Sequence, residues 1–152
     1  MISFVNDYSE GACDEILRAM IETNHTQTPG YGLDAHCEQA AELIRKACGT
    51  RKADVHFLVG GTQCNKTLIA AALRPHEAVI CADTGHINVH ETGAVENSGH
   101  KVIALRADDG KVRCADIEQA VKKHTDEHMV KPKMVYLSNA TELGTFYTKQ
   151  EL

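Results

Sequence analysis

Residues 57–66 read Phe-Leu-Val-Gly-Gly-Thr-Gln-Cys-Asn-Lys, an apolar run followed by a Gly-Gly-Thr corner and the start of a helical pattern. We predict a strand over 55–59 and a helix over 62–73 that Arg74-Pro75 ends. Two glycines permit a tight turn and let a ligand approach closely. The Thr62 hydroxyl, the free amides of the helix start and the helix dipole favour an anion there, most naturally a phosphate.

The corner has a second interpretation, a strand-to-helix turn that binds nothing. Gly-Gly alone is a weak signal, and the chain has no complete Gly-x-Gly-x-x-Gly or Walker pattern at this place. From spacing alone, both interpretations stay open.

The predicted elements alternate between strand and helix patterns along the chain. Helices are also predicted over 13–20, between Asp34 as N-cap and Gly49 as stop, from the turn at 83–86 through Val95, and over 116–124. Further strands are predicted over 78–81, 101–105 and 134–137. This alternation indicates an α/β fold with a mostly parallel sheet and flanking helices. Because ligands bind beyond the carboxyl ends of such strands, we expect Gly60–Thr62, Asp83–His86 and Ser138–Thr141 to form one site.

Bulk properties narrow the class of protein. The 152 residues suffice for one domain with a core, and the net charge of −5 with scattered basic residues argues against nucleic-acid binding. We see no signal peptide and no apolar run near the roughly 18 residues of a membrane span. The six cysteines are widely spaced, mostly within apolar patterns. We therefore expect reduced, buried thiols in a cytoplasmic protein.

Polar residues beside the predicted strand ends and the first helix have alternative roles. His86, close to Asp83, suits stacking on an aromatic ligand or proton transfer, or it is a half-buried histidine bonded to a neighbour. His86 and His90 share a helix face, yet no third ligand is placed by spacing, so we expect no metal site. Asp7 is expected to cap local backbone amides.

Five ordered motifs carry a resemblance to a known family. They are Asn6-Asp7-Tyr8, Gly30-Tyr31-Gly32, Gly60-Gly61-Thr62 with Asn65, Gly85-His86-Ile87 with Glu91 and Gly93, and Asn139-Ala140-Thr141-Glu142. In this order and spacing they resemble the low-specificity threonine aldolase (beta-eliminating lyase) family of pyridoxal-phosphate enzymes with the aspartate aminotransferase fold, type I. The resemblance runs from about residue 3 to the last residue, and the ordered set is specific although each motif alone is weak.

The resemblance implies pyridoxal 5'-phosphate as the cofactor and assigns roles to the motif residues. Gly60, Gly61 and Thr62 would hold the cofactor phosphate. His86 would stack on the pyridine ring and take part in proton transfer. Asn6 falls where relatives often carry a serine near the substrate carboxylate, and His90 where they often carry a tyrosine near the active site of the dimer.

The chain also departs from the family pattern. Gly60 and Cys64 differ from the common Ser-Gly-Thr-x-Gly-Asn sequence, and neither change removes a needed amide. Thr141 falls where many aldolases have a second histidine, which puts threonine in doubt as the substrate. The family's Schiff-base lysine has no counterpart here, since Lys66 lies on the helix after the corner.

The end of the chain carries a helix-start signal. Thr148-Lys149-Gln150-Glu151 has the form of a capping box, and Leu152 is the last residue. Either the chain is cut short, or the match is a coincidence on a frayed tail. With the resemblance, we expect residues 1–152 to be the N-terminal portion of the large domain, without its remainder or the small C-terminal domain, and to be inactive alone.

The expected function of the full-length protein is that of an aldehyde-lyase. The resemblance implies cleavage of threonine or a related β-hydroxy-α-amino acid to glycine and an aldehyde, in a homodimer or homotetramer with no nucleic-acid or membrane partner. One alternative is another pyridoxal-phosphate reaction such as β-elimination, racemisation or transamination. A non-catalytic phosphate-binding module is the other.

Overall fold

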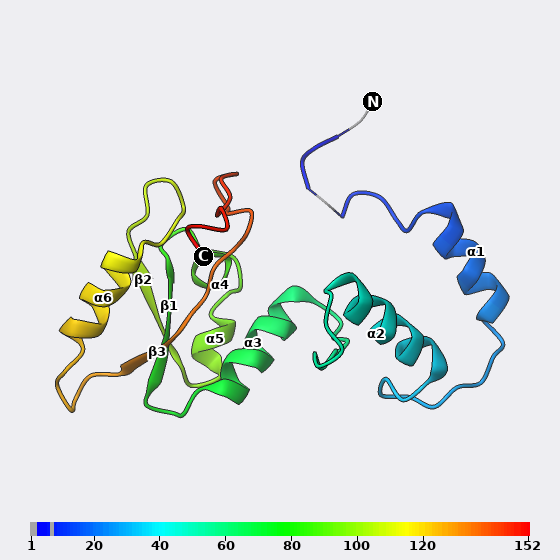
Figure 1. Ribbon diagram of the computed structural model, residues 1–152, viewed down its shortest axis with the longest axis horizontal. Helices are drawn as coiled ribbons and strands as arrows, with labels where there is room; N and C mark the ends of the chain where they lie inside the picture. The colour runs from blue at the N-terminus through cyan, green and yellow to red at the C-terminus, as the bar shows by residue number, and fades with distance from the viewer. Residues whose placement is uncertain (1–2, 7) are drawn as a thin grey trace. The chain divides into compact units, whose positions relative to one another are not determined.

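The computed structural model describes residues 3–6 and 8–152 and divides into two compact units, Met1–Phe57 and Leu58–Leu152. Figure 1 shows the helices and strands that each unit contains. The expected capping role of Asp7 lies outside the described residues. None of the described helices is long and apolar enough to cross a membrane.

The first unit contains α1 (Asp14–Thr23) and α2 (Ala35–Ala47). The predicted ends of α2 are confirmed. Asp34 is its N-cap and accepts a hydrogen bond from the Cys37 amide at 2.9 Å, and Gly49 follows the helix with a φ of 66°. Ala41 is the one buried residue among the described residues of this unit, so the unit has no hydrophobic core of its own.

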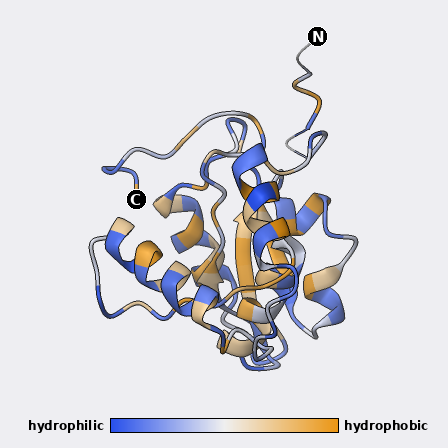
Figure 2. Cartoon of the chain, turned by 90° about the vertical axis from the view of Figure 1, so that its right-hand side faces the viewer, coloured by the Kyte–Doolittle hydropathy of each residue, from blue (hydrophilic) through white to orange (hydrophobic). Residues whose placement is uncertain are grey.

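The second unit is built on a parallel sheet of three strands. β1 (Glu77–Ala82) lies between β2 (Lys101–Leu105) and β3 (Lys131–Val135), and the strand order is β2-β1-β3. Residues 78–82 of β1 are all buried, as expected for the central strand of a sheet covered on both faces. The predicted α/β fold with a mostly parallel sheet is confirmed, and Figure 2 shows the hydrophobic residues along the strands.

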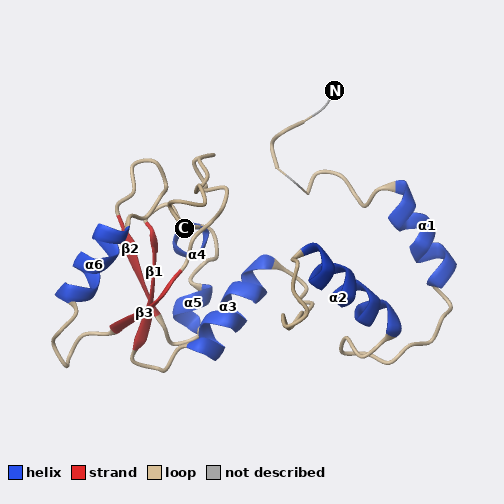
Figure 3. Ribbon diagram, viewed as in Figure 1, coloured by secondary structure: helices blue, strands red, loops and turns tan. Residues whose placement is uncertain are grey.

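Helices cover both faces of this sheet (Figure 3). α6 (Cys114–Lys123) covers one face, where Ala120 packs with Ala78 and Ile80 of β1. The other face carries α3 (Gly61–Ala72), α4 (His86–Val89) and α5 (Ala94–Asn97). Their apolar side chains pack on Val79 and Cys81, which alternate with Ala78 and Ile80 because side chains of a strand point to opposite faces.

Three sequence predictions about elements were wrong. Residues 55–59 form no strand, because a strand needs a hydrogen-bonded neighbour and none pairs with this stretch among the described residues. The single helix predicted through Val95 is two short helices, separated where Thr92 and Gly93 adopt left-handed φ values of 55° and 72°. β3 begins at Lys131 rather than at Met134, and the pairing register shifts beside Pro132, as is common for proline on an edge strand.

The expectation of buried thiols holds for one of the six cysteines. All six are free, and only Cys81 is buried. Burial raises the pKa of the Cys81 thiol to about 12, which keeps it protonated and unreactive. The others lie at exposed or half-buried positions, because the apolar patterns around them belong to helix surfaces or loops.

Candidate functional site

The Gly-Gly-Thr corner forms the N-terminus of the twelve-residue helix α3. Gly60 is the N-cap, and the first backbone bond of the helix runs from the Cys64 amide to the Gly60 carbonyl at 3.0 Å. The preceding amides of the first turn have no acceptor within the helix. Gly60, Gly61 and Thr62 are all exposed, so this turn offers accessible donors for an anion.

The glycines are not required by the backbone conformation. Gly60 has a φ of −172°, which is extended backbone that any residue adopts, and Gly61 does not lie in the left-handed region. The tight-turn reason for these glycines was therefore wrong. A Cβ added at either position would meet no atom within 4 Å, so the absence of side chains leaves open space at the helix start. That space fits the close approach of a phosphate.

The His86 ring is hydrogen-bonded at Nδ1, and part of the ring is exposed to solvent. His86 begins α4 and its side chain is 40% exposed, while its Nδ1 lies 2.8 Å from Oε1 of Glu91. Asn65 donates to the same oxygen at 2.6 Å from the second turn of α3. Glu91 therefore links α3 to His86. The histidine is half-buried and bonded to a neighbour, as one interpretation expected, and its exposed part remains accessible.

The Glu91 carboxylate is fully enclosed. Its side chain has no exposed area, and Oε2 has no hydrogen-bond partner among the described residues. A buried carboxylate oxygen without a partner is costly, so it calls for an explanation. Glu91 and Asn65 both belong to the sequence motifs, but their contact was not predicted, because Asn65 lies on α3 and Glu91 lies 26 positions later, between α4 and α5.

His90 lies beside His86. The His90 amide donates to the His86 carbonyl at 2.9 Å, and the two ring centroids are 5.4 Å apart with a tilt of 52°. Among the residues that the structure describes, no group of three or more histidine, cysteine, aspartate or glutamate side chains is arranged to hold a metal ion.

The carboxyl ends of β1 and β2 are tied together by Asp83. Its amide donates to the Leu105 carbonyl at 2.8 Å, and its Oδ1 accepts from the amides of Thr84 and Ala107, each at 3.1 Å. This aspartate is thus occupied in fixing the turn that leads to His86.

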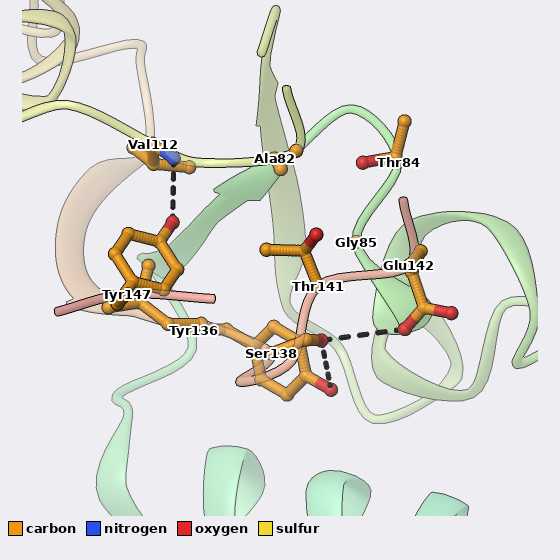
Figure 4. A pocket seen from close by; sticks show the side chains of 11 residues that line it. Ala82, Thr84, Gly85, Val112, Tyr136, Ser138, Thr141, Glu142 and Tyr147 are labelled. Atoms are coloured by element: carbon orange, nitrogen blue, oxygen red, sulfur yellow. Dashed lines mark hydrogen bonds between the residues drawn. The ribbon is translucent and has the colours of Figure 1, made fainter. Parts of the chain in front are cut away.

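A small pocket lies beyond the strand ends, as predicted (Figure 4). Thr84 and Gly85 line it from the end of β1, and Ser138 and Thr141 line it from the segment after β3. Two of the three expected segments therefore meet directly. The third, the corner at residues 60–62, does not line this pocket and is connected to His86 through Asn65 and Glu91.

Thr141 uses its hydroxyl within its own loop. It is buried, and Oγ1 lies 2.8 Å from Oγ1 of Thr145 and accepts the Thr145 amide at 3.2 Å. The Thr145 hydroxyl in turn donates to the Asp109 carbonyl at 2.7 Å. The Thr141 hydroxyl is therefore committed to holding this loop.

The remaining sequence-predicted residues lie elsewhere. Asn6 belongs to the first unit, where its Oδ1 accepts from the Tyr8 amide at 3.0 Å and the Ser9 hydroxyl at 2.7 Å, so its expected substrate contact stays a prediction. Lys66, on α3, donates to Oδ1 of Asn97 at 2.7 Å.

The chain is similar to known proteins over nearly its whole length. The family model described as "Beta-eliminating lyase" matches residues 4–152. Two proteins named low specificity L-threonine aldolase, from Pseudomonas sp. (strain NCIMB 10558) and Pseudomonas aeruginosa, are each 34% identical over 151 residues, covering 98% of this chain and 43% of theirs. A solved structure of Leishmania major threonine aldolase is 55% identical with a TM-score of 0.95, covering 97% of this chain and 43% of that one. The chain thus spans less than half the length of these relatives.

Proposed function

Because the chain belongs to the beta-eliminating lyase family, we propose that it forms the cofactor-phosphate end of a pyridoxal-phosphate-dependent lyase. The full-length protein would cleave threonine or a related β-hydroxy-α-amino acid to glycine and an aldehyde. The observation that carries this proposal is the exposed N-terminus of α3, a helix that is joined to His86 through Asn65 and Glu91.

Members of this family use pyridoxal phosphate, and the corner fits its phosphate group. The amides of Gly61 and Thr62 and the Thr62 hydroxyl would bind the phosphate at the positive end of the α3 dipole. Open space at both glycines allows the phosphate oxygens to reach the backbone. When bound, the cofactor supplies the electron-withdrawing ring on which amino-acid cleavage depends.

His86 would act on the ring face and on a proton. Its side chain is anchored through Nδ1 and 40% exposed, so an aromatic ring can stack on it while Nε2 holds or accepts a proton. His90, whose ring lies beside that of His86, would contribute to binding the substrate. In the full-length protein, Asn6 would bind the substrate carboxylate. The six free cysteines support a cytoplasmic location, and we further propose a homodimer or homotetramer.

A second reaction on the same scaffold is favoured by Thr141. Its hydroxyl is bonded to Thr145 within the loop and is therefore not free to serve the substrate hydroxyl. If no other group serves that role, the protein would favour β-elimination, racemisation or transamination over aldol cleavage.

Product analysis of the full-length protein tests the proposal. With pyridoxal phosphate and L-threonine, allo-threonine or serine, we expect glycine and the matching aldehyde from the two threonine isomers. The reaction should require added cofactor after dialysis, and the His86→Phe variant should be slower by about a hundredfold or more.

Other products would redirect or end the proposal. Ammonia with a keto acid, or the opposite enantiomer, would establish the second reaction instead. Tight binding of pyridoxal phosphate with no turnover of any amino acid would leave the non-catalytic phosphate-binding module as the function.

A further inference from the structure

We propose that Glu91 is a positioning residue that fixes the His86 imidazole in the tautomer with hydrogen on Nδ1, leaving Nε2 as the proton-accepting atom. The catalytic consequence rests on the proposed function, whereas the assignment of the tautomer rests on geometry alone.

The hydrogen bonds that Oε1 of Glu91 accepts determine the tautomer of His86. Oε1 of Glu91 accepts from Nδ2 of Asn65 at 2.6 Å, and Nδ1 of His86 lies 2.8 Å from the same atom. An ionised carboxylate only accepts hydrogen bonds, so Nδ1 must carry the hydrogen. In a neutral imidazole the other nitrogen, Nε2, then has the free lone pair.

The surroundings keep this arrangement fixed. The Glu91 side chain has no exposed area, so water does not compete for Oε1, and Asn65 on α3 donates to the same carboxylate. On the other side of the pair, the His86 side chain is 40% exposed, and Nε2 has no hydrogen-bond partner among the described residues. The bound nitrogen thus faces the protein, and the ring's free nitrogen remains available.

The unpaired Oε2 of Glu91 indicates that this residue has a role besides stabilising the fold. Oε2 is buried without a partner in the described part of the chain, and a side chain placed only for packing would be better as an apolar residue of the same size. Features that break such local rules are concentrated at functional sites. The apolar cluster of Ile69, Ile87 and Val95 nearby shows that this region accepts apolar side chains.

Nitrogen NMR of the imidazole rings tests the tautomer directly. In the full-length protein labelled with ¹⁵N-histidine, with the His86 signals identified by their loss in His86→Phe, we expect the Nδ1–H pattern for His86. Glu91→Gln should keep that pattern, because the Gln amide oxygen still accepts from both Asn65 and His86. Glu91→Leu should lose it, and circular dichroism checks that the variant is folded.

A double-mutant comparison tests the link to catalysis. Glu91→Leu should lower kcat by on the order of tenfold or more in the wild-type background. In the His86→Phe background it should change kcat by less than about twofold, because a residue that acts through His86 has nothing left to position.

The results separate this inference from the proposed function. An Nε2–H pattern for His86 in the unmodified protein overturns the inference and needs no variant to be folded. Equal losses of kcat in both backgrounds overturn the positioning role. If no amino acid is cleaved, the proposed function fails while the NMR result still decides the tautomer.

Discussion

The glycines of the phosphate corner matter for the space they leave. Neither Gly60 nor Gly61 adopts a φ that other residues avoid, and a methyl group at either would touch nothing in the protein. Folding therefore does not require glycine at these positions. Binding of the cofactor requires glycine at these positions, because we propose that the phosphate closely approaches the backbone amides.

Gly61→Ala separates these two requirements. Alanine favours a helix over glycine by up to about 1 kcal/mol, so the Tm of the cofactor-free protein should stay the same or rise. The affinity for pyridoxal phosphate should fall by about tenfold, which corresponds to about 1.4 kcal/mol. Thermal unfolding and equilibrium binding measure the two effects. A lower Tm with unchanged affinity would contradict this account of the corner.

The Tyr147 hydroxyl has a structural role. It accepts a hydrogen bond from the Val112 amide at 2.7 Å, and both residues are buried. Tyr147→Phe leaves that amide unpaired and should lower the free energy of unfolding by about 1–3 kcal/mol. Urea denaturation measures the loss. Tyr31→Phe, at a fully exposed position, is the matched control and should change stability little.

Elements whose signals lie within a few neighbouring residues were predicted from the sequence. Contacts between segments far apart in the chain were not. The capped helix between Asp34 and Gly49 and the strand at 101–105 were predicted because their signals lie within a few residues. The strand at 55–59 was wrong because strand formation depends on a partner elsewhere in the chain. The contact of Asn65 with Glu91 depends in the same way on how α3 packs against the segment between α4 and α5, so sequence spacing did not indicate it.

The segment at the end of the chain is attached by charge. Glu151 accepts from Lys111 Nζ at 2.8 Å and 3.0 Å and from the Thr148 amide at 2.7 Å, the latter being one half of the predicted capping box. These bonds, that of Lys111 first, lower the pKa of Glu151 from an ordinary 4.5 to about 2.

Acid should release this segment over a defined range. A lowered pKa in the folded state means that the contribution of Glu151 is fully present above pH 4.5 and is lost as the pH falls through about 2. The Thr148 amide NMR signal should follow that titration. Glu151→Gln should abolish it, and Glu142→Gln, on the same segment, should not. A midpoint near 4.5 in the unmodified protein would contradict the attachment.

The two units differ in how they are stabilised. Residues 58–152 carry a sheet with apolar clusters on both faces, whereas Ala41 is the one buried residue among those described in 3–57. Regions with few buried apolar contacts open at low free-energy cost. The first unit of the isolated chain should therefore open before the second.

Limited proteolysis measures this difference. In the isolated 152-residue chain, trypsin should cleave at Arg18, Lys46 and Lys52 well before it cleaves at Lys101 or Lys133 within the sheet. The expected stable product contains residues 58–152. Early cleavage within β2 or β3 would show that the sheet is not the more stable unit.

Equilibrium binding of pyridoxal phosphate to the full-length protein tests the proposed cofactor site most directly. Thr62→Val removes one hydroxyl from the start of α3, while Thr67→Val makes the same change at an exposed position further along that helix. A hydrogen bond to a charged group contributes about 1.5–3 kcal/mol, so Thr62→Val should raise the Kd by about tenfold to a hundredfold. Thr67→Val should leave it unchanged. Equal Kd values for the two variants, or no binding to the unmodified protein, would contradict the assignment of this corner to the cofactor phosphate.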